Sequence, residues 1–276
     1  MKNFIIFLIF INNLFSLEKY KEENILSIWN VEEKKLKLVE HRKLKGLEQL
    51  NNLKFHDELW KIISEFYPED VINRIDKFVV FSDNNKNNRN GMSGLIESVD
   101  GTNNSRFILS VDIADAYYGN KISLEVFLNL LVHEFFHLVS LNDTQISPNY
   151  TKGVKIYEGY TYESSYINKF YEKFWNNSLG KRLEMLELNS KLSFAQKETI
   201  REELYKYNQD KFVDTYAMTN MVEDIAVSFE DFIRLNKGYL GDSLKDKKID
   251  FFYSYADLVK YKNHFIQKKK EMIRKY

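Results

Sequence analysis

Residues 131–139 read Leu-Val-His-Glu-Phe-Phe-His-Leu-Val, and the rest of the sequence is best understood outward from this stretch. Its centre, from His133 to His137, has the pattern HExxH. Apolar residues flank the pattern on both sides, and over 123–141 they occupy nearly every face of a helix. The sequence therefore predicts a buried helix over 123–141 that carries three ionisable side chains.

The spacing of these side chains favours a metal site. Residues four apart lie on one face of a helix, so His133 and His137 can bind the same zinc ion, with Glu134 beside them. The chain has only five histidines in 276 residues, which makes a chance occurrence of this pattern rare. The motif predicts one Zn²⁺ per chain and hydrolysis by a zinc-bound water that Glu134 activates as general base.

A catalytic zinc site needs a third protein ligand, and three acidic residues are candidates. Asp143 falls at the position of a third ligand in the extended motif HExxHxxGxxH/D, but Ser140 stands where that motif has glycine. Glu158 lies 21 residues after His137, followed by a glycine. Glu223 lies near the start of a predicted helix over 220–235. The residues alone leave Glu158 and Glu223 both open.

The segment 212–226 reads Phe-Val-Asp-Thr-Tyr-Ala-Met-Thr-Asn-Met-Val-Glu-Asp-Ile-Ala. Asn220 is a suitable cap for the helix that follows it. Together with the HExxH stretch, this segment resembles the gluzincin-like zinc metallopeptidases found among exported bacterial proteins. The resemblance covers two stretches of roughly fifteen residues each. It implies a zincin-like fold and peptidase activity on a peptide or protein substrate. It also implies His133, His137 and Glu223 as zinc ligands, Glu134 as general base, and Tyr216 as the hydroxyl that stabilises the oxyanion.

One position departs from the family pattern. Val227 stands four residues after Glu223, where related enzymes often place an acid that orients a zinc-bound histidine. The sequence offers Asp224 or Asp214 for this role.

Composition narrows the class of protein further. The chain has 40 basic and 40 acidic residues and a formal net charge of zero, so no overall field attracts nucleic acid or an anionic membrane. Without cysteine it has neither disulfides nor thiolate metal ligands. The three remaining histidines, His41, His56 and His264, are expected at the surface or at its boundary.

Along the chain, residues 1–16 resemble a secretory signal peptide. They predict an exported protein, periplasmic, in the cell envelope or secreted, with no stable membrane span after cleavage. Residues 17–50 are predicted to be a charged helical lead-in, and residues 51–276 a single zinc metallopeptidase domain. Strands are expected over 78–82, 94–99 and 107–113, and helices over 57–67, 123–141, 155–175, 180–191, 194–208, 220–235 and 249–275.

This order predicts an α+β fold in which a small sheet precedes a mostly helical part. Strand 107–113 is expected at the sheet edge, where an extended peptide could pair with it. The main alternative is a catalytically inactive zinc-binding surface or interaction protein, which would not need Glu134. A fortuitous motif in a structural protein and a zinc hydrolase of non-peptide substrates are further alternatives. The oligomeric state is not predicted.

Overall fold

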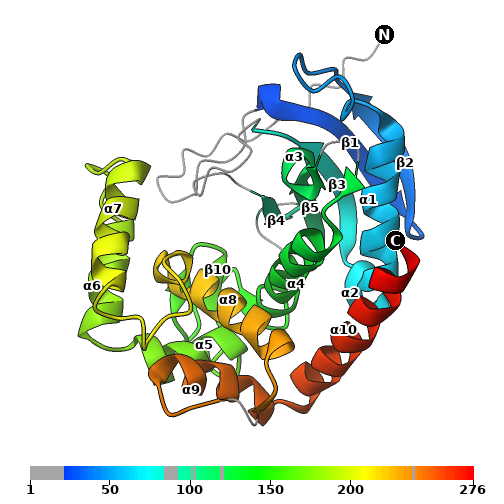
Figure 1. The fold of residues 1–276 in the computed structure, drawn as a ribbon. Helices are drawn as coiled ribbons and strands as arrows, with labels where there is room; N and C mark the ends of the chain where they lie inside the picture. The colour runs from blue at the N-terminus through cyan, green and yellow to red at the C-terminus, as the bar shows by residue number, and fades with distance from the viewer. Residues whose placement is uncertain (1–21, 84–92, 100, 102–103, 119–120, 238–239) are drawn as a thin grey trace.

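The computed structural model describes residues 22–83, 93–99, 101, 104–118, 121–237 and 240–276. It confirms an α+β fold in which a small mixed sheet precedes a mostly helical part (Figure 1). The predicted signal peptide, residues 1–16, lies outside the described residues. Among the helices of the described ranges, none combines the length and the apolar character needed to cross a membrane.

The main sheet has five strands in the order β2-β1-β3-β5-β4. Strands β3 and β5 are parallel, and the other neighbouring pairs are antiparallel. The strand bounds are β1 Ile25–Glu32, β2 Lys35–His41, β3 Ile75–Phe81, β4 Gly94–Ser98 and β5 Phe107–Asp112. The three strands predicted over 78–82, 94–99 and 107–113 are thus present.

The helical lead-in predicted over 17–50 is wrong, because residues 25–41 form the β1–β2 hairpin. Glu33 and Lys34 connect the two strands with φ values of 51° and 64°, as a tight hairpin turn requires. Strand β2 lies at the sheet edge and is mostly exposed, so it carries charged residues between its few apolar ones. This pattern of charged residues is also typical of the solvated face of a helix, which explains the wrong prediction.

The predicted position of the sheet edge is also wrong. Strand 107–113 (β5) lies inside the sheet, between β3 and β4, and five of its six residues are buried. The edge strand on this side of the sheet is β4, whose five residues are all half-buried. The sheet order places β4 beside the motif helix, which it contacts.

The helices of the N-terminal half are α1 Leu53–Phe66, α2 Glu69–Ile72, α3 Ile113–Ala116 and α4 Leu124–Ser140. Those of the C-terminal half are α5 Tyr166–Phe170, α6 Ser178–Glu187, α7 Phe194–Tyr205, α8 Met221–Arg234, α9 Leu244–Phe251 and α10 Ala256–Lys275. Short helical turns are Glu22–Asn24, Tyr171–Trp175, Tyr216–Met218 and Phe252–Ser254.

Two predicted helices differ from the structure. Residues 155–161 are not helical but contain two short strands, β9 (Lys155–Ile156) and β10 (Gly159–Thr161), which form a small sheet with β8 (Ile146–Ser147). The predicted helix 249–275 is divided between α9 and α10 by a turn at Phe252–Ser254. A second hairpin, β6 (Tyr117–Tyr118) with β7 (Lys121–Ile122), precedes α4.

The motif helix α4 crosses α8 at the centre of the molecule (Figure 1). The ring of Phe136 stacks on that of Phe229 at 4.5 Å, and the ring of Phe252 meets both at 5.4–5.5 Å. These fully buried aromatic side chains fix the relative position of the two helices, which carry the candidate metal ligands.

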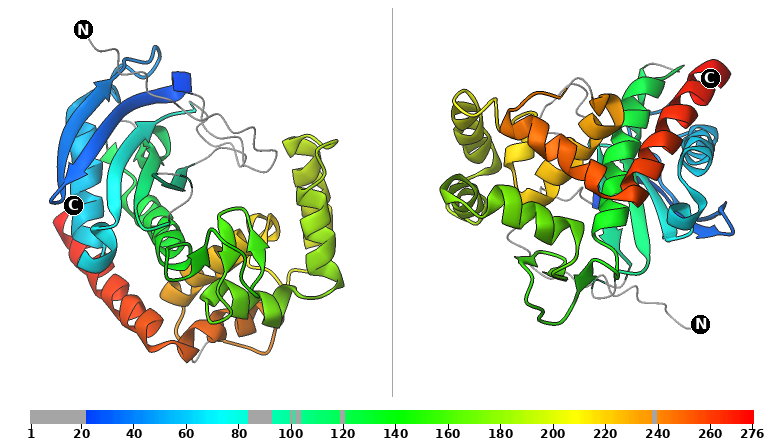
Figure 2. Two further views of the ribbon diagram at one scale, coloured as in Figure 1. Left: turned by 180° about the vertical axis from the view of Figure 1, so that it is seen from behind. Right: turned by 90° about the horizontal axis from the view of Figure 1, so that it is seen from below.

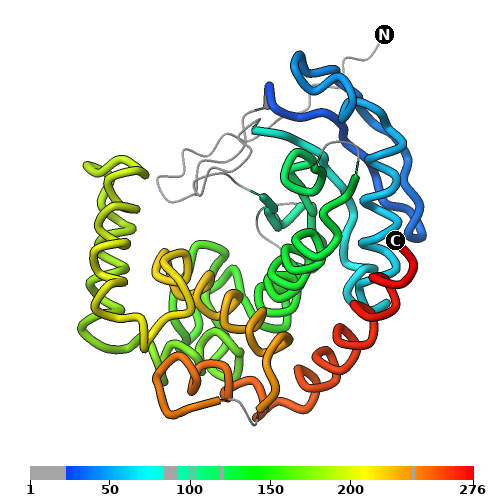
Figure 3. The backbone as a smooth tube through the Cα atoms, in the orientation of Figure 1, coloured from blue at the N-terminus to red at the C-terminus, as the bar shows by residue number. Residues whose placement is uncertain are grey.

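The last helix, α10, packs against α1 near the start of the described chain. In the tube drawing of Figure 3, α10 returns from the helical part to lie beside α1. Phe265 packs on Phe66 at 4.8 Å, and Lys275 forms an ion pair with Glu65 at 2.6 Å. The α6–α7 hairpin, by contrast, stands apart from the sheet in both views of Figure 2.

Candidate metal centre

His133 and His137 lie one turn apart on α4, and their rings point to one place. Their Nε2 atoms are 3.0 Å apart. The Oε2 atom of Glu223, on α8, lies 3.1 Å from Nε2 of His133 and 3.4 Å from Nε2 of His137. All three side chains are buried, and their candidate ligand atoms lie within 4.8 Å of one another. The structure thus assembles a cluster that could hold a metal ion.

Local structure fixes Glu223 in this place. The side chain of Asn220 accepts hydrogen bonds from the backbone N–H groups of Val222 and Glu223, at 2.8 and 3.0 Å. The predicted cap is therefore present, and it starts α8 so that Glu223 lies in the first turn. From there its carboxylate reaches across to α4.

The charges in the cluster reinforce one another. Burial alone would raise the pKa of Glu223, but the neighbouring His137 and the hydrogen bonds to both histidines lower that pKa far below its usual value. Burial would lower the pKa of His133, but hydrogen bonds to Glu223 and Glu230 raise that pKa well above its usual value. The site is therefore built to hold positive charge at its centre.

Glu230 is a site residue that the sequence analysis missed. Its Oε1 atom lies 2.8 Å from Nδ1 of His133. Glu230 follows Glu223 by seven residues, or about two helical turns, so both carboxylates leave the same face of α8. That spacing is the signal that could have identified it. With Nδ1 of His133 donating to Glu230, Nε2 keeps its lone pair for a metal ion.

Neither residue proposed to orient a histidine does so. Asp224 is fully buried and accepts hydrogen bonds from Lys248 and from Nε1 of Trp175, both at 2.6 Å. Asp214 accepts a hydrogen bond from the backbone N–H of Ala217 at 2.8 Å and stabilises the turn before α8. The role expected four residues after Glu223 is instead taken one turn later, by Glu230.

Glu134 lies beside the cluster and against the edge strand β4. Burial raises the pKa of its carboxyl, while the two histidines oppose that shift. A Cβ atom built on Gly94 would lie 2.6 Å from Oε1 of Glu134, so only glycine leaves room for this carboxylate. Oε2 of Glu134 is buried and has no hydrogen-bond partner within the described parts of the chain. Within the described residues, this oxygen is therefore available to accept a proton.

Tyr216 also lies at the centre. Its ring centroid is 5.9 Å from that of His133. Burial, followed by the negative charges of Glu223 and Glu134, raises the pKa of its hydroxyl well above the usual value. The hydroxyl therefore stays protonated and can donate a hydrogen bond.

The two other candidates for third ligand are placed differently. Oδ1 of Asp143 forms an ion pair with Nη1 of Arg74 at 2.9 Å, away from the cluster. Glu158 lies close enough to His137 and Glu223 for their charges to shift its pKa, but it is not part of the group whose ligand atoms converge. The geometry thus favours Glu223.

The remaining histidines are structural. His41 and His264 are half-buried and each contacts one backbone carbonyl, that of Asn51 or Phe66, at 2.9 Å. The surface or boundary position expected for His56 is wrong, because its side chain is fully buried. It lies 2.7 Å from Oγ of Ser27 and 2.8 Å from the carbonyl oxygen of Leu50. A helix that packs on the sheet brings this polar ring inside.

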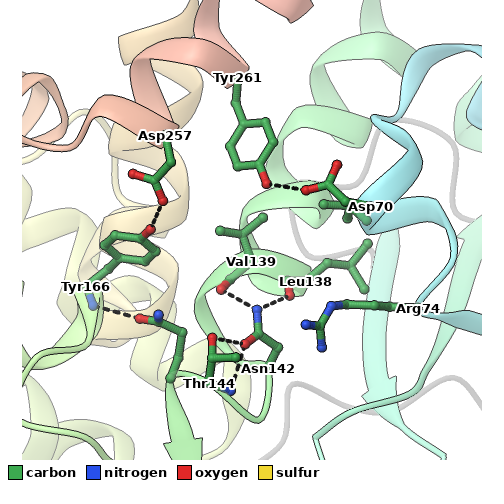
Figure 4. Close-up of a pocket in the computed structure, with 11 residues that line it drawn as sticks. Asp70, Arg74, Leu138, Val139, Asn142, Thr144, Tyr166, Asp257 and Tyr261 are labelled. Carbon is green, nitrogen blue, oxygen red and sulfur yellow. Dashed lines mark hydrogen bonds between the residues drawn. The ribbon is translucent and has the colours of Figure 1, made fainter.

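A hollow of about 200 Å³ lies on another face of α4 (Figure 4). Its polar groups are largely paired with one another: Tyr166 donates to Asp257, and Tyr261 donates to Asp70 at 2.7 Å. None of the clustered ligands lines it. The hollow is therefore distinct from the candidate metal centre.

The arrangement suits a divalent ion with nitrogen and oxygen ligands. Bonds of about 2.1 Å at tetrahedral angles separate ligand atoms by roughly 3.4 Å. The three observed separations, 3.0, 3.1 and 3.4 Å, are close to that value. Three protein ligands leave a fourth position for water or substrate, as in catalytic sites.

Comparison of the chain with family models, with curated proteins and with solved structures gave no match. The case for function therefore rests on the geometry of the residues themselves.

Proposed function

We propose that this protein is a zinc-dependent metallopeptidase of the gluzincin type. The observation that carries the proposal is the convergence of His133, His137 and Glu223 on one point, with Glu134 beside them. Two imidazoles and one carboxylate are a ligand set that zinc prefers in hydrolases, and a zincin-like fold is part of the proposal. When bound, zinc would polarise the scissile carbonyl and make an attacking water more acidic.

The chain's own side chains supply the remaining steps. Glu134 accepts the proton of the attacking water at its Oε2 atom, which has no partner in the described part of the chain, and returns that proton to the leaving nitrogen. Tyr216, kept protonated by its buried and negatively charged surroundings, donates a hydrogen bond to the oxyanion. Glu230 keeps His133 in the tautomer and orientation that a ligand needs.

The neighbouring edge strand favours a peptide as substrate. Asp112 donates from its backbone N–H to the carbonyl of Ser93 at 2.9 Å, so residue 93 is hydrogen-bonded to β5. Along a strand of an antiparallel pair, the backbone N–H and C=O groups of successive residues point alternately toward the partner strand and away from it. The backbone groups of Gly94 and Ile96 therefore point away from β5. An extended peptide that pairs with them would pass near Glu134, because a Cβ atom on Gly94 would point at that carboxylate.

The test is peptide hydrolysis by the purified, zinc-loaded protein, read by mass spectrometry of a casein digest. We expect cleavage that falls by about 10²–10⁴-fold in Glu134→Gln, with zinc content unchanged. Glu125→Gln, an exposed glutamate on the same helix, is the matched control and should cleave normally. A zinc-loaded wild type that cleaves nothing, or no faster than Glu134→Gln, would instead favour a catalytically inactive zinc-binding protein.

A further inference from the structure

Glu158 is a half-buried acid near the metal centre for which the proposed hydrolysis has no use. It lies in the turn between β9 and β10. Its Oε2 atom is buried and has no hydrogen-bond partner among the residues that the structure describes. A buried carboxylate oxygen without a partner is costly, and a ligand that donates a hydrogen bond to it would offset that cost.

The backbone holds this turn in place. Gly159 has a φ of 141°, and a Cβ atom there would lie 2.4 Å from the carbonyl oxygen of Ser147. The carbonyl of Glu158 accepts a hydrogen bond from Nδ2 of Asn104 at 3.3 Å, which ties the turn to the segment between β4 and β5. The position of Glu158 is therefore fixed from two sides rather than left to a free loop.

The carboxyl group of Glu158 lies close enough to the metal centre to interact with its charges. Burial raises the pKa of Glu158, a hydrogen bond from its own backbone N–H and the charge of His137 oppose that rise, and the charge of Glu223 adds to it. Yet the ligand atoms that converge are those of His133, His137 and Glu223 only. Glu158 is thus near the ligands without being one of them.

Four carboxyl groups interact at the centre, those of Glu134, Glu158, Glu223 and Glu230. Glu223 is the candidate ligand, Glu230 contacts His133, and Glu134 is the proposed general base. A site of low dielectric constant that gathers several carboxyl groups attracts cations. Of these four, Glu158 has no other task, so it is the carboxylate available for a cation.

We propose that Glu158 binds a cationic group of the substrate next to the scissile bond and thereby selects peptides that carry one. This inference rests on the proposed peptidase function. The shared chemistry is an ammonium or guanidinium group, supplied either by a free peptide N-terminus or by a Lys or Arg side chain. Hydrogen bonds to the carboxylate would replace the water that the cation loses on burial.

The probe is a set of synthetic peptides with one randomised core in three forms. The first has a free N-terminus and no other cation, the second an acetylated N-terminus and one lysine, and the third an acetylated N-terminus with norleucine in place of that lysine. The proteins are zinc-loaded wild type, Glu158→Gln, and Glu163→Gln as a matched control, because Glu163 is exposed in the same segment. Zinc content is measured for each.

For the wild type we expect kcat/KM to be about tenfold or more higher for at least one cationic form than for the neutral form. Glu158→Gln should reduce that ratio to near one while keeping its zinc, and Glu163→Gln should keep the ratio. Loss of the preference for the first form only identifies the N-terminus as the cation, and loss for the second form only identifies the side chain.

Three results would overturn the inference: equal cleavage of all forms by the wild type, an unchanged ratio in Glu158→Gln, or loss of zinc from Glu158→Gln, which would make it a ligand. If the wild type cleaves no form, the proposed function fails on its own account. Binding of N-acetyl-lysinamide and of glycinamide, measured by calorimetry, then decides: binding lost in Glu158→Gln supports cation recognition, and no binding to the wild type contradicts it.

Discussion

Glu230 on α8 reaches His133 on α4, with 2.8 Å between Oε1 and Nδ1. The contact joins residues 97 positions apart and leaves Nε2 of His133 directed at Glu223 and His137. A carboxylate behind a metal-binding histidine raises its basicity and fixes its ring.

Glu230→Ala should therefore weaken zinc affinity by about 10–100-fold, because the ring of His133 loses its orienting partner. Competition with a chromophoric zinc chelator measures the affinity. Glu202→Ala, an exposed glutamate on α7, is the control and should bind as the wild type does. Equal affinity in Glu230→Ala would show that the contact has no part in metal binding.

Gly94→Ala should impair catalysis without removing the metal. The new Cβ would lie 2.6 Å from Oε1 of Glu134, so the carboxylate must move. A displacement of this size should lower kcat by roughly tenfold to a hundredfold. Steady-state kinetics and zinc content, measured on the same sample, check this. An unchanged kcat would mean that Glu134 does not act from the position seen here.

Removing one partner of the buried ion pair between Asp224 and Lys248 should strongly destabilise the fold. The two charges are 2.6 Å apart and both side chains are at most 1% exposed. Lys248→Met should lower the free energy of unfolding by about 3–5 kcal/mol, because it leaves the carboxylate of Asp224 buried without its cation. Urea unfolding of the metal-free protein measures this change.

Replacing both partners tests the reason for that loss. The double variant Asp224→Leu with Lys248→Met should recover most of the stability, since no charge is then left uncompensated. A double variant as unstable as Lys248→Met alone would show that packing, rather than charge, causes the loss.

His56 should make the fold sensitive to acid. Its neutral ring fits a chain of hydrogen bonds in which Nε2–H donates to Leu50 and Nδ1 accepts from Ser27, which in turn accepts from Trp29. Burial lowers the pKa of His56 from 6.5 to about 4. Between these values the unfolded chain binds a proton that the folded chain does not, so stability falls as pH falls from 6.5 to 4.

At the acid end of that range, this pKa shift lowers the free energy of unfolding by about 3 kcal/mol. Urea unfolding of the metal-free protein from pH 7 to pH 4 should therefore show a steeper loss of stability in the wild type than in His56→Gln. All other ionisable groups are the same in both proteins, so the difference isolates His56. Parallel pH profiles would contradict a neutral buried ring.

Local sequence patterns predicted the elements that carry the chemistry. The apolar surroundings of HExxH predicted α4, and Asn220 predicted the start of α8. Both signals are short-range: a buried apolar face and a capping side chain act within one or two turns. The same patterns place His133, His137 and Glu223 correctly on their helices.

Long-range pairing was not predictable in the same way. The charged sequence of residues 25–41 favours solvated helices over a hairpin, because the edge strand β2 is mostly exposed and has no clear buried face. The order of β5 and β4 depends on a parallel pairing that no local pattern encodes. His56 is buried only because α1 packs on β1, and Glu230 becomes relevant only because α8 crosses α4. Apart from the hairpin itself, each of these errors concerns a contact between segments that are distant in the sequence.

The central claim is that His133, His137 and Glu223 hold one zinc ion. Inductively coupled plasma mass spectrometry of the purified wild type, Glu223→Gln and Glu158→Gln tests it directly. We predict about one zinc per chain in the wild type and in Glu158→Gln, and almost none in Glu223→Gln, since two histidines alone bind weakly. A folded wild type that holds no zinc after reconstitution, or a Glu223→Gln variant that keeps a full equivalent, would contradict the claim.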